Sequence, residues 1–404
     1  MFDESKMSQK EQLSEQYTLP NGWEWAKLGE VCAVIMGQSP PGNTYIDEPG
    51  GLPFFQGKAD FSDYFPEVRV WCTQPLKIAE EGDILISVRA PVGPINMNNL
   101  KCCIGRGLAA VRCKNKAINW YIFWYLRSIE AKVASLGSGS TFGAIKRNDL
   151  ASLEIPLPRV EEQKRIASKI QELMQEVGRA RAACEKQLEA AKALPAAHLH
   201  QVFESPEAKK WEKKKLREVC EIVTGSTPRT DDPSNWGGEI LWTTPNDLGK
   251  LEGSTIEDTE RKITKEGFNS CSTKMLPPGS VLLTTRAPIG HLAINLKPMC
   301  TNQGFKSLIS YSQAHNWFLF FAIKFFIPVL QAIGRGQTFT EISKSQVENF
   351  VIPIPPLLEQ KRIAAKIKEF MQEIELTRKA CEKQLEIINA MSKSILNKAF
   401  KTNL

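Results

Sequence analysis

The chain of 404 residues is longer than one ordinary hydrophobic core organises, so its length predicts two or three domains. Apolar residues at 42% and charged residues at 24% are typical of a globular protein, and they exclude a chain that is disordered throughout. The net charge of +7, from 52 basic and 45 acidic residues, permits a polyanionic partner but does not require one.

The start of the chain and its cysteines indicate a compartment. Residues 1–16 are polar and lack the apolar centre of a signal peptide. The ten cysteines contain no Cys-x-x-Cys pair, so a zinc site of that type is not expected. We therefore expect a cytoplasmic protein with reduced cysteines.

The sequence contains an internal repeat with an offset of 197 residues. Residues 158–188 match residues 355–385 at 20 of 31 positions, and Arg89-Ala-Pro matches Arg286-Ala-Pro. Nearer the start the offset is 188, which pairs Cys32 with Cys220. The repeat also explains the apolar segment 316–334, because its twin carries several charged residues that a membrane span would not tolerate. Both segments are predicted to be core helices, and no membrane partner is expected.

Each repeat has a globular part and a helical part. Residues 1–157 and 206–354 combine short β-type runs with Gly/Pro turns and one aromatic helix, which predicts mixed α/β domains. Residues 158–205 and 355–404 are each predicted to form one long helix, although Pro195 can kink or end the first. Apolar residues alternate in steps of four and three, as in a coiled-coil seam, with Gln187 and Gln384 at equivalent positions that we expect to be buried.

The predicted fold class is therefore α+β, with two tandem mixed α/β domains joined by two long helices. A pseudo-two-fold relation between the repeats makes the helices an antiparallel coiled coil. The alternative is that each helix packs separately on its own domain. In the antiparallel arrangement the helices act as a spacer between two similar domains, which suits a ligand with two separated sites such as duplex DNA.

Several motifs carry a family resemblance. Leu19-Pro-Asn-Gly-Trp opens the first domain, and Pro-x-x-x-Glu-Gln-Lys-Arg-Ile-Ala begins both helices, at residues 158–167 and 355–364. Together with the domain–helix–domain–helix order, these motifs resemble the specificity subunit of type I restriction–modification systems. The resemblance implies that residues 1–157 and 206–354 are target-recognition domains, each reading one half of a bipartite asymmetric DNA site.

The same resemblance implies the partners. The helices at 158–205 and 355–404 would set the gap between half-sites and bind two methyltransferase subunits, and restriction/translocase subunits would join the larger complex. The chain would be non-catalytic and would direct adenine methylation and DNA cleavage by its partners. Two alternatives stay open: a stand-alone DNA-binding regulator, and a protein scaffold that binds no nucleic acid.

No chemistry of the chain's own emerges from its motifs. An Asn/Asp-Pro-Pro-aromatic motif is missing, and the Gly-rich run 137–143 lacks the Lys-Ser/Thr of a nucleotide loop. We interpret that run as a turn, or as a contact to backbone phosphate. Carboxylate–lysine pairs such as Glu260 and Lys262 have no counterpart in the other repeat. We expect no enzyme, no cofactor and no metal.

The repeat also separates candidate DNA contacts by role. Positions shared by both domains should serve the fold or phosphate binding, as we expect for Arg89 and Arg286, whose alternative is a structural hydrogen bond to a turn. Differing positions in equivalent segments, 55–60 with 242–247 and 101–106 with 297–303, should read bases. Asp60 and Asp247 recur and are alternatively turn-formers. The candidates are Gln56, Lys58, Arg89, Lys101, Arg106, Thr243, Asn246, Arg286, Lys297 and Gln303.

The matching helix starts supply the candidate partner surface. Equivalent residues at two helices imply two copies of one partner, which a stand-alone regulator would not need. The residues assigned to partner binding and to the spacer are Glu162, Gln163, Arg165, Ile166, Glu359, Gln360, Arg362 and Ile363.

Overall fold

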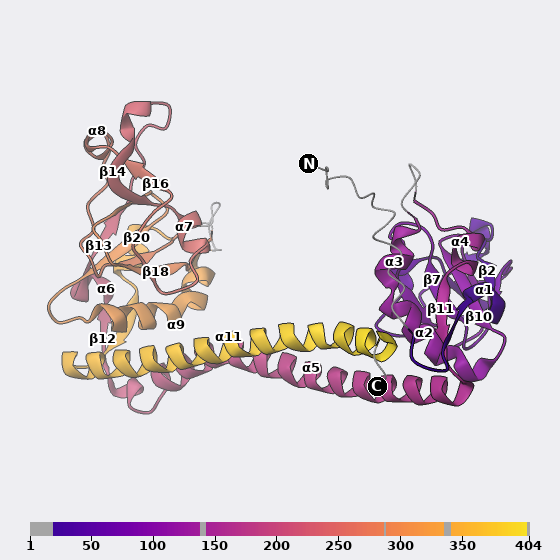
Figure 1. Cartoon of the computed structure of the whole chain (residues 1–404). Helices are drawn as coiled ribbons and strands as arrows, with labels where there is room; N and C mark the ends of the chain where they lie inside the picture. The colour runs from indigo at the N-terminus through magenta and orange to yellow at the C-terminus, as the bar shows by residue number, and fades with distance from the viewer. Residues whose placement is uncertain (1–18, 138–142, 287, 335–340, 402–404) are drawn as a thin grey trace, which may run out of the picture. The chain divides into compact units, whose positions relative to one another are not determined.

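The computed structural model describes residues 19–137, 143–286, 288–334 and 341–401, which form two compact units. The first unit comprises residues 1–185 and 383–404, and the second comprises residues 186–382. Each unit contains one globular domain and parts of both long helices (Figure 1). The compact units therefore do not follow the order of the chain.

The first unit is built on a four-stranded antiparallel sheet and a second, mixed sheet. The four-stranded sheet has the order β2-β10-β7-β8, with β2 (Cys32–Met36), β7 (Ile84–Ser87), β8 (Ile95–Met97) and β10 (Leu108–Cys113). The mixed sheet has the order β3-β5-β4-β9-β6, with β3 (Tyr45–Ile46), β4 (Leu52–Phe55), β5 (Trp71–Cys72), β6 (Ile78–Ala79) and β9 (Cys102–Ile104). A separate pair, β1 (Glu24–Lys27) with β11 (Glu154–Leu157), joins the two ends of the domain.

An almost fully buried helix fills the centre of the first unit. In α2 (Asn119–Ser128) all six residues from Tyr121 to Leu126 are buried, so the helix has no polar face. It packs between the four-stranded sheet and the long helix α5 (Val160–Phe203) in one hydrophobic core. The remaining helices are short: α1 (Leu28–Val31), α3 (Glu130–Ser135) and α4 (Arg147–Ala151).

The second unit repeats this plan. A five-stranded sheet has the order β13-β20-β17-β18-β15, with β13 (Cys220–Thr224), β15 (Thr255–Ile256), β17 (Val281–Leu283), β18 (Leu292–Asn295) and β20 (Lys306–Ser310). A three-stranded sheet contains β16 (Arg261–Ile263), β14 (Trp236–Thr243) and β19 (Cys300–Thr301), and β12 (Glu212–Lys215) pairs with β21 (Val351–Ile354). The helices are α6 (Leu216–Val219), α7 (Pro245–Gly249), α8 (Lys265–Asn269), α9 (Asn316–Gly334), α10 (Lys344–Glu348) and α11 (Leu357–Lys401).

The apolar segment flagged in the sequence is the core helix of this second unit. Among the described residues, α9 is the one helix long and apolar enough to cross a membrane by length and composition. It is packed between the five-stranded sheet and the start of α11 (Figure 1), with Phe318 to Ile323 all buried. This packing supports its interpretation as the counterpart of α2.

Each core is completed by the end of the other repeat's helix. In the first unit Phe400, near the end of α11, packs against Tyr121 and Tyr125 at ring-centroid distances of 5.5 and 5.3 Å. In the second unit the equivalent Phe203, near the end of α5, lies 5.7 Å from Phe318 and stacks on Phe325 at 5.2 Å. Within each unit the start of one helix therefore lies beside the end of the other, so the two helices are antiparallel there.

The predicted fold class is confirmed, and the alternative in which each helix packs only on its own domain is wrong. Seam residues near the helix starts, such as Ile170 and Ile367, are buried as predicted. Gln187 and Gln384 are exposed, which corrects the prediction that they are buried register residues. The helix α5 continues past Pro195 to Phe203.

The ten cysteines are free, and nine of them are buried. The recurring pairs Cys32 with Cys220, Cys103 with Cys300 and Cys184 with Cys381 all belong to the buried set. This confirms that their recurrence reflects packing in the core.

The exchange of helix ends predicts a distant effect of a C-terminal substitution. Phe400→Ala removes a buried ring from the first core and should destabilise that unit by about 3–5 kcal/mol. Hydrogen exchange measured by mass spectrometry should accelerate in residues 119–128 and stay unchanged in residues 316–334. The matched variant Phe203→Ala should give the opposite pattern, and equal acceleration in both helices would contradict the exchanged ends.

Candidate nucleic-acid interface

Two of the predicted segments meet at one edge of the first unit. Strands β4 and β9 run parallel, with Phe54 opposite Cys103 and Phe55 opposite Ile104, so the residues that follow them emerge side by side. The N–H of Gly105 donates to the carbonyl of Phe55 at 2.8 Å. The exposed side chains of Gln56 and Arg106 follow immediately. We call this place, at residues 56–58 and 105–107, the first recognition edge.

Close backbone contact fixes this edge. A Cβ atom on Gly107 would lie 2.2 Å from the carbonyl oxygen of Gln56, so only glycine fits there without displacing the neighbouring segment. The Asp60 carboxylate accepts hydrogen bonds from the N–H groups of Gln56 and Gly57 at 2.7 and 3.3 Å. Asp60 therefore forms the turn, as its alternative interpretation proposed, and leaves Lys58 exposed on it.

Two further segments complete the edge. The N–H of Val88 donates to the carbonyl of Gly107 at 2.9 Å, which brings the exposed Arg89 beside it. The segment after β2 also joins, because Gln38 N–H donates to Ile104 at 3.0 Å and Ser39 Oγ accepts from Arg106 N–H at 3.2 Å. Sequence reasoning missed this last segment.

A second recognition edge, at residues 244–246 and 302–304, repeats this arrangement. Strands β14 and β19 run parallel with Thr243 opposite Thr301, and Asn302 N–H donates to the Thr243 carbonyl at 3.1 Å. Asn246 and Gln303 are exposed at the positions equivalent to the first edge. Thr227, from the segment after β13, donates its hydroxyl to Gln303 Oε1.

The phosphate candidate of the second unit also keeps its place. The N–H of Thr285 donates to Gly304 at 2.8 Å, and the exposed Arg286 follows it. Arg286 forms a backbone bridge with Glu341, as Arg89 does with Ala144. The Gly-rich run that begins at Gly137 and its twin lie largely outside the described residues.

Three predicted contacts do not belong to these edges. Thr243 is 0% exposed and donates its hydroxyl to Met299 Sδ at 3.1 Å, because it is the last residue of β14 and points into the core. Lys101 and Lys297 precede β9 and β19, so strand direction places them away from the edge, and Lys101 pairs with Glu80 at 3.3 Å. Direct base reading at the edges by these three residues is therefore corrected.

The surroundings of the edges offer no reactive group. Burial raises the pKa of the Cys102 thiol to about 12 and that of the Cys300 thiol to about 11, so both are neutral at physiological pH. Among the described residues no group of three His, Cys, Asp or Glu side chains is placed to hold a metal ion. What the edges present is a set of exposed hydrogen-bonding and cationic side chains.

The helix starts separate into a buried half and an exposed half. Gln163 and Gln360 are buried and donate to the carbonyls of Pro158 and Pro355 at 2.7 and 2.8 Å, and Ile166 and Ile363 lie in the cores. Burial leaves these four side chains to position the helix, and it removes them from any direct contact with a partner.

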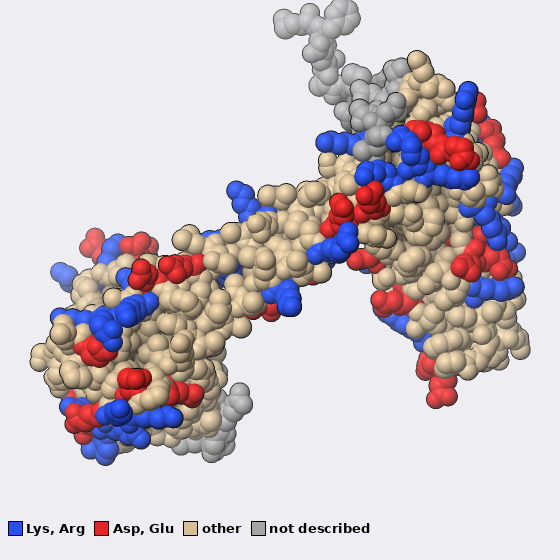
Figure 2. Space-filling model, turned by 90° about the horizontal axis from the view of Figure 1, so that it is seen from below, with Lys and Arg blue, Asp and Glu red and all other residues tan. Residues whose placement is uncertain are grey.

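The exposed half consists of two equivalent ion pairs. Arg165 donates to both carboxylate oxygens of Glu162, at 3.0 and 2.7 Å, and Arg362 donates likewise to Glu359. These contacts hold the pKa of both carboxyl groups below the usual range. On the face shown in Figure 2, basic and acidic side chains are interspersed in both units.

Comparison with known proteins identifies the family. The model of the type I restriction modification DNA specificity domain matches residues 20–186 and again residues 208–386. The chain belongs to this family. Both matched segments span one globular domain and most of the helix that follows it, which confirms the resemblance found in the sequence.

Individual relatives agree with this assignment. The putative type I restriction enzyme MjaX specificity subunit of Methanocaldococcus jannaschii is 45% identical over 170 residues, 41% of this chain and 39% of that relative. The MjaVIII specificity subunit of the same organism is 25% identical over 96% of this chain and 95% of its own length. Over the better-matching MjaX alignment, the chain thus spans about two fifths of its relative.

Solved structures show the same fold. A chain from a study of complex assembly and conformational transition of the type I R-M system has a TM-score of 0.74 and 26% identity, over 96% of this chain and 100% of that chain. The HsdS subunit from Thermoanaerobacter tengcongensis has a TM-score of 0.68 and 25% identity, over 96% and 99%.

Proposed function

We propose that this protein is the non-catalytic specificity subunit of a type I restriction–modification complex. Its target-recognition domains, residues 1–157 and 206–354, each read one half of a bipartite asymmetric site in double-stranded DNA. One observation carries the proposal: the same edge is built twice, with Gln56 and Arg106 in one unit and Asn246 and Gln303 in the other. Equal scaffolds with different exposed side chains suit two different half-sites.

The chemistry of the edges supports DNA reading. Arginine donates two parallel hydrogen bonds to guanine, and glutamine or asparagine pairs with adenine, in the major groove. Arg89 and Arg286 are shared by both units and exposed beside the edges, which suits contact to phosphates common to any sequence. The segments after β2 and β13 add Gln38 and Thr227 to the candidate contacts.

The two long helices, residues 158–205 and 355–404, set the gap between half-sites and bind two methyltransferase subunits. Support comes from the equivalent exposed pairs Glu162–Arg165 and Glu359–Arg362, which offer the same surface twice. In the complex the methyltransferases modify adenine and the restriction/translocase subunits cleave DNA. The complex acts on DNA in the cytoplasm, and this chain contributes no cofactor.

Base-resolution methylation mapping tests the function as a whole. Host DNA is compared with and without this gene, while the methyltransferase subunit is present in both strains. A split motif should disappear with the gene, and the motif would supply both half-sites. Unchanged methylation would contradict the proposal and leave the regulator or scaffold alternatives.

The position of Arg106 predicts a local change of specificity. Arg106→Ala should reduce discrimination at one base pair of one half-site by about 1–3 kcal/mol and leave the other half-site unchanged. Competition binding of the methyltransferase complex to single-base variants of the site measures this. Lys101→Ala is the matched control, because it removes a cation of the same unit that pairs with Glu80 away from the edge. Equal effects of the two variants would contradict the assignment.

The spacer predicts a change of gap. Inserting one helical turn in both α5 and α11 adds about 5.4 Å, which corresponds to one or two base pairs at about 3.4 Å each. Methylation mapping of the lengthened protein should show the same half-sites with a wider gap. A changed half-site sequence would be the opposite result.

A further inference from the structure

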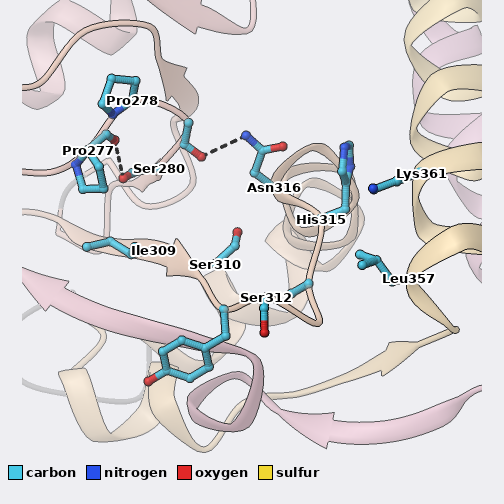
Figure 3. Close-up of a pocket in the computed structure, with 13 residues that line it drawn as sticks. Pro277, Pro278, Ser280, Ile309, Ser310, Ser312, His315, Asn316, Leu357 and Lys361 are labelled. Atoms are coloured by element: carbon cyan, nitrogen blue, oxygen red, sulfur yellow. Dashed lines mark hydrogen bonds between the residues drawn. The ribbon is translucent and has the colours of Figure 1, made fainter.

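A hollow of about 390 Å³ lies beside the start of α11 in the second unit (Figure 3). The turn at Pro277–Pro278, the end of β20 at Ser310, and the first residues of α9 and α11 surround it. Ser280, at its wall, precedes β17, whereas Arg286 follows that strand. The hollow is therefore at the end of the sheet opposite to the recognition edge, next to the exposed pair of Glu359 and Arg362.

The first unit shows why the hollow exists. At the equivalent positions it carries an ionic network, in which Arg112 donates to the two oxygens of the buried Asp83 at 3.0 and 2.7 Å. The second unit has Ile309 in place of this arginine and Ser280 in place of the aspartate. The shorter and uncharged side chains leave space where the first unit is filled.

The walls of the hollow retain unsatisfied polar atoms. Ser310 Oγ and His315 Nδ1 are buried and have no hydrogen-bond partner among the described residues. Burial, with a smaller contribution from Lys361, lowers the pKa of His315. The ring is therefore neutral at physiological pH, and the charge at the rim belongs to Lys361.

The rim is apolar and exposed, unlike its counterpart. Leu358 is 83% exposed and Tyr311 is 43% exposed, and both line or border the mouth of the hollow at the first turn of α11. The equivalent residues of the first unit are Glu161 and Lys114. Large side chains of this kind gathered around a hollow mark an interaction surface.

The lysine at the rim differs in the same way. In the first unit Lys164 pairs with Glu161 at 3.0 Å. Its equivalent Lys361 has Leu358 three residues before it and makes no ion pair within the described part of the chain. An apolar hollow beside an unpaired cation complements an apolar side chain that is flanked by a carboxylate.

We propose that this hollow receives an apolar side chain of a methyltransferase subunit, with an acidic neighbour at Lys361. The inference rests on the proposed function, because it concerns the same helix starts. The hollow is continuous with the exposed Glu359–Arg362 pair, and a desolvated anchor of this kind dominates binding energy at interfaces. The first unit lacks it. The second repeat therefore binds its methyltransferase more tightly, and the two subunits assemble in a fixed order.

The test titrates the full chain with the methyltransferase subunit encoded beside it and follows the complexes by native mass spectrometry. A 1:1 complex should accumulate before the 2:1 complex, with dissociation constants that differ about tenfold or more. Leu358→Glu, which installs the residue of the first repeat, should weaken the first step about tenfold so that the steps merge. The pair Ser280→Asp with Ile309→Arg should act likewise by filling the hollow.

Leu376→Glu is the matched control, since Leu376 is 70% exposed on the same helix about five turns away. It should leave the first step unchanged. Two equal steps for the unaltered chain, or equal effects of the Leu358 and Leu376 variants, would overturn the anchor while leaving the proposed function intact. Absence of any methyltransferase binding would overturn both. A Leu358→Glu effect confined to self-association of the isolated chain would assign the hollow to a second copy.

Discussion

The exchange of helix ends is the constraint on which the rest of the structure depends. Phe203 and Phe400 are equivalent residues of the repeat, and each fills the core of the domain that its own repeat does not contain. Neither ring can be buried unless the two helices run in opposite directions within that unit. A shift of one helix by a heptad would withdraw both rings, so the cores fix the register that the exposed Gln187 and Gln384 do not.

The recognition edges show how one scaffold carries two specificities. Parallel pairing of β4 with β9, and of β14 with β19, brings two segments together through backbone hydrogen bonds that are independent of side-chain identity. Close contact demands a glycine such as Gly107, but it places no demand on Gln56 or Arg106, whose side chains face solvent. The backbone is therefore kept in both repeats while the exposed side chains differ.

Most of the architecture could be predicted because repeats and heptads are visible as patterns. The offset of 197 residues located both domains, and the four-three spacing located both helices. Individual contacts were harder, because a pattern treats a segment as one unit while burial changes from one residue to the next. Thr243 and Asn246 lie in one predicted segment, yet the first closes a strand inside the core and the second is exposed.

The glutamines at the helix starts illustrate a second limit. Gln163 and Gln360 are shared by both repeats, which by the filter applied to DNA contacts should have assigned them to the fold; they were assigned to a partner surface instead. Their amides hold the chain at the domain–helix junction. Gln38 was missed because it lies where the offset is 188, although Gly37-Gln38-Ser39-Pro40 matches Gly225-Ser226-Thr227-Pro228 there.

The place of Phe400 also bears on how the protein is made. A ribosome releases the first domain long before residues 396–400, yet Leu396, Ala399 and Phe400 belong to the core of that domain. The second domain already has Phe203 available when its own residues emerge. The domain that is synthesised first thus closes its core last, and its nascent form exposes the apolar surface around Tyr121 and Tyr125 until translation ends.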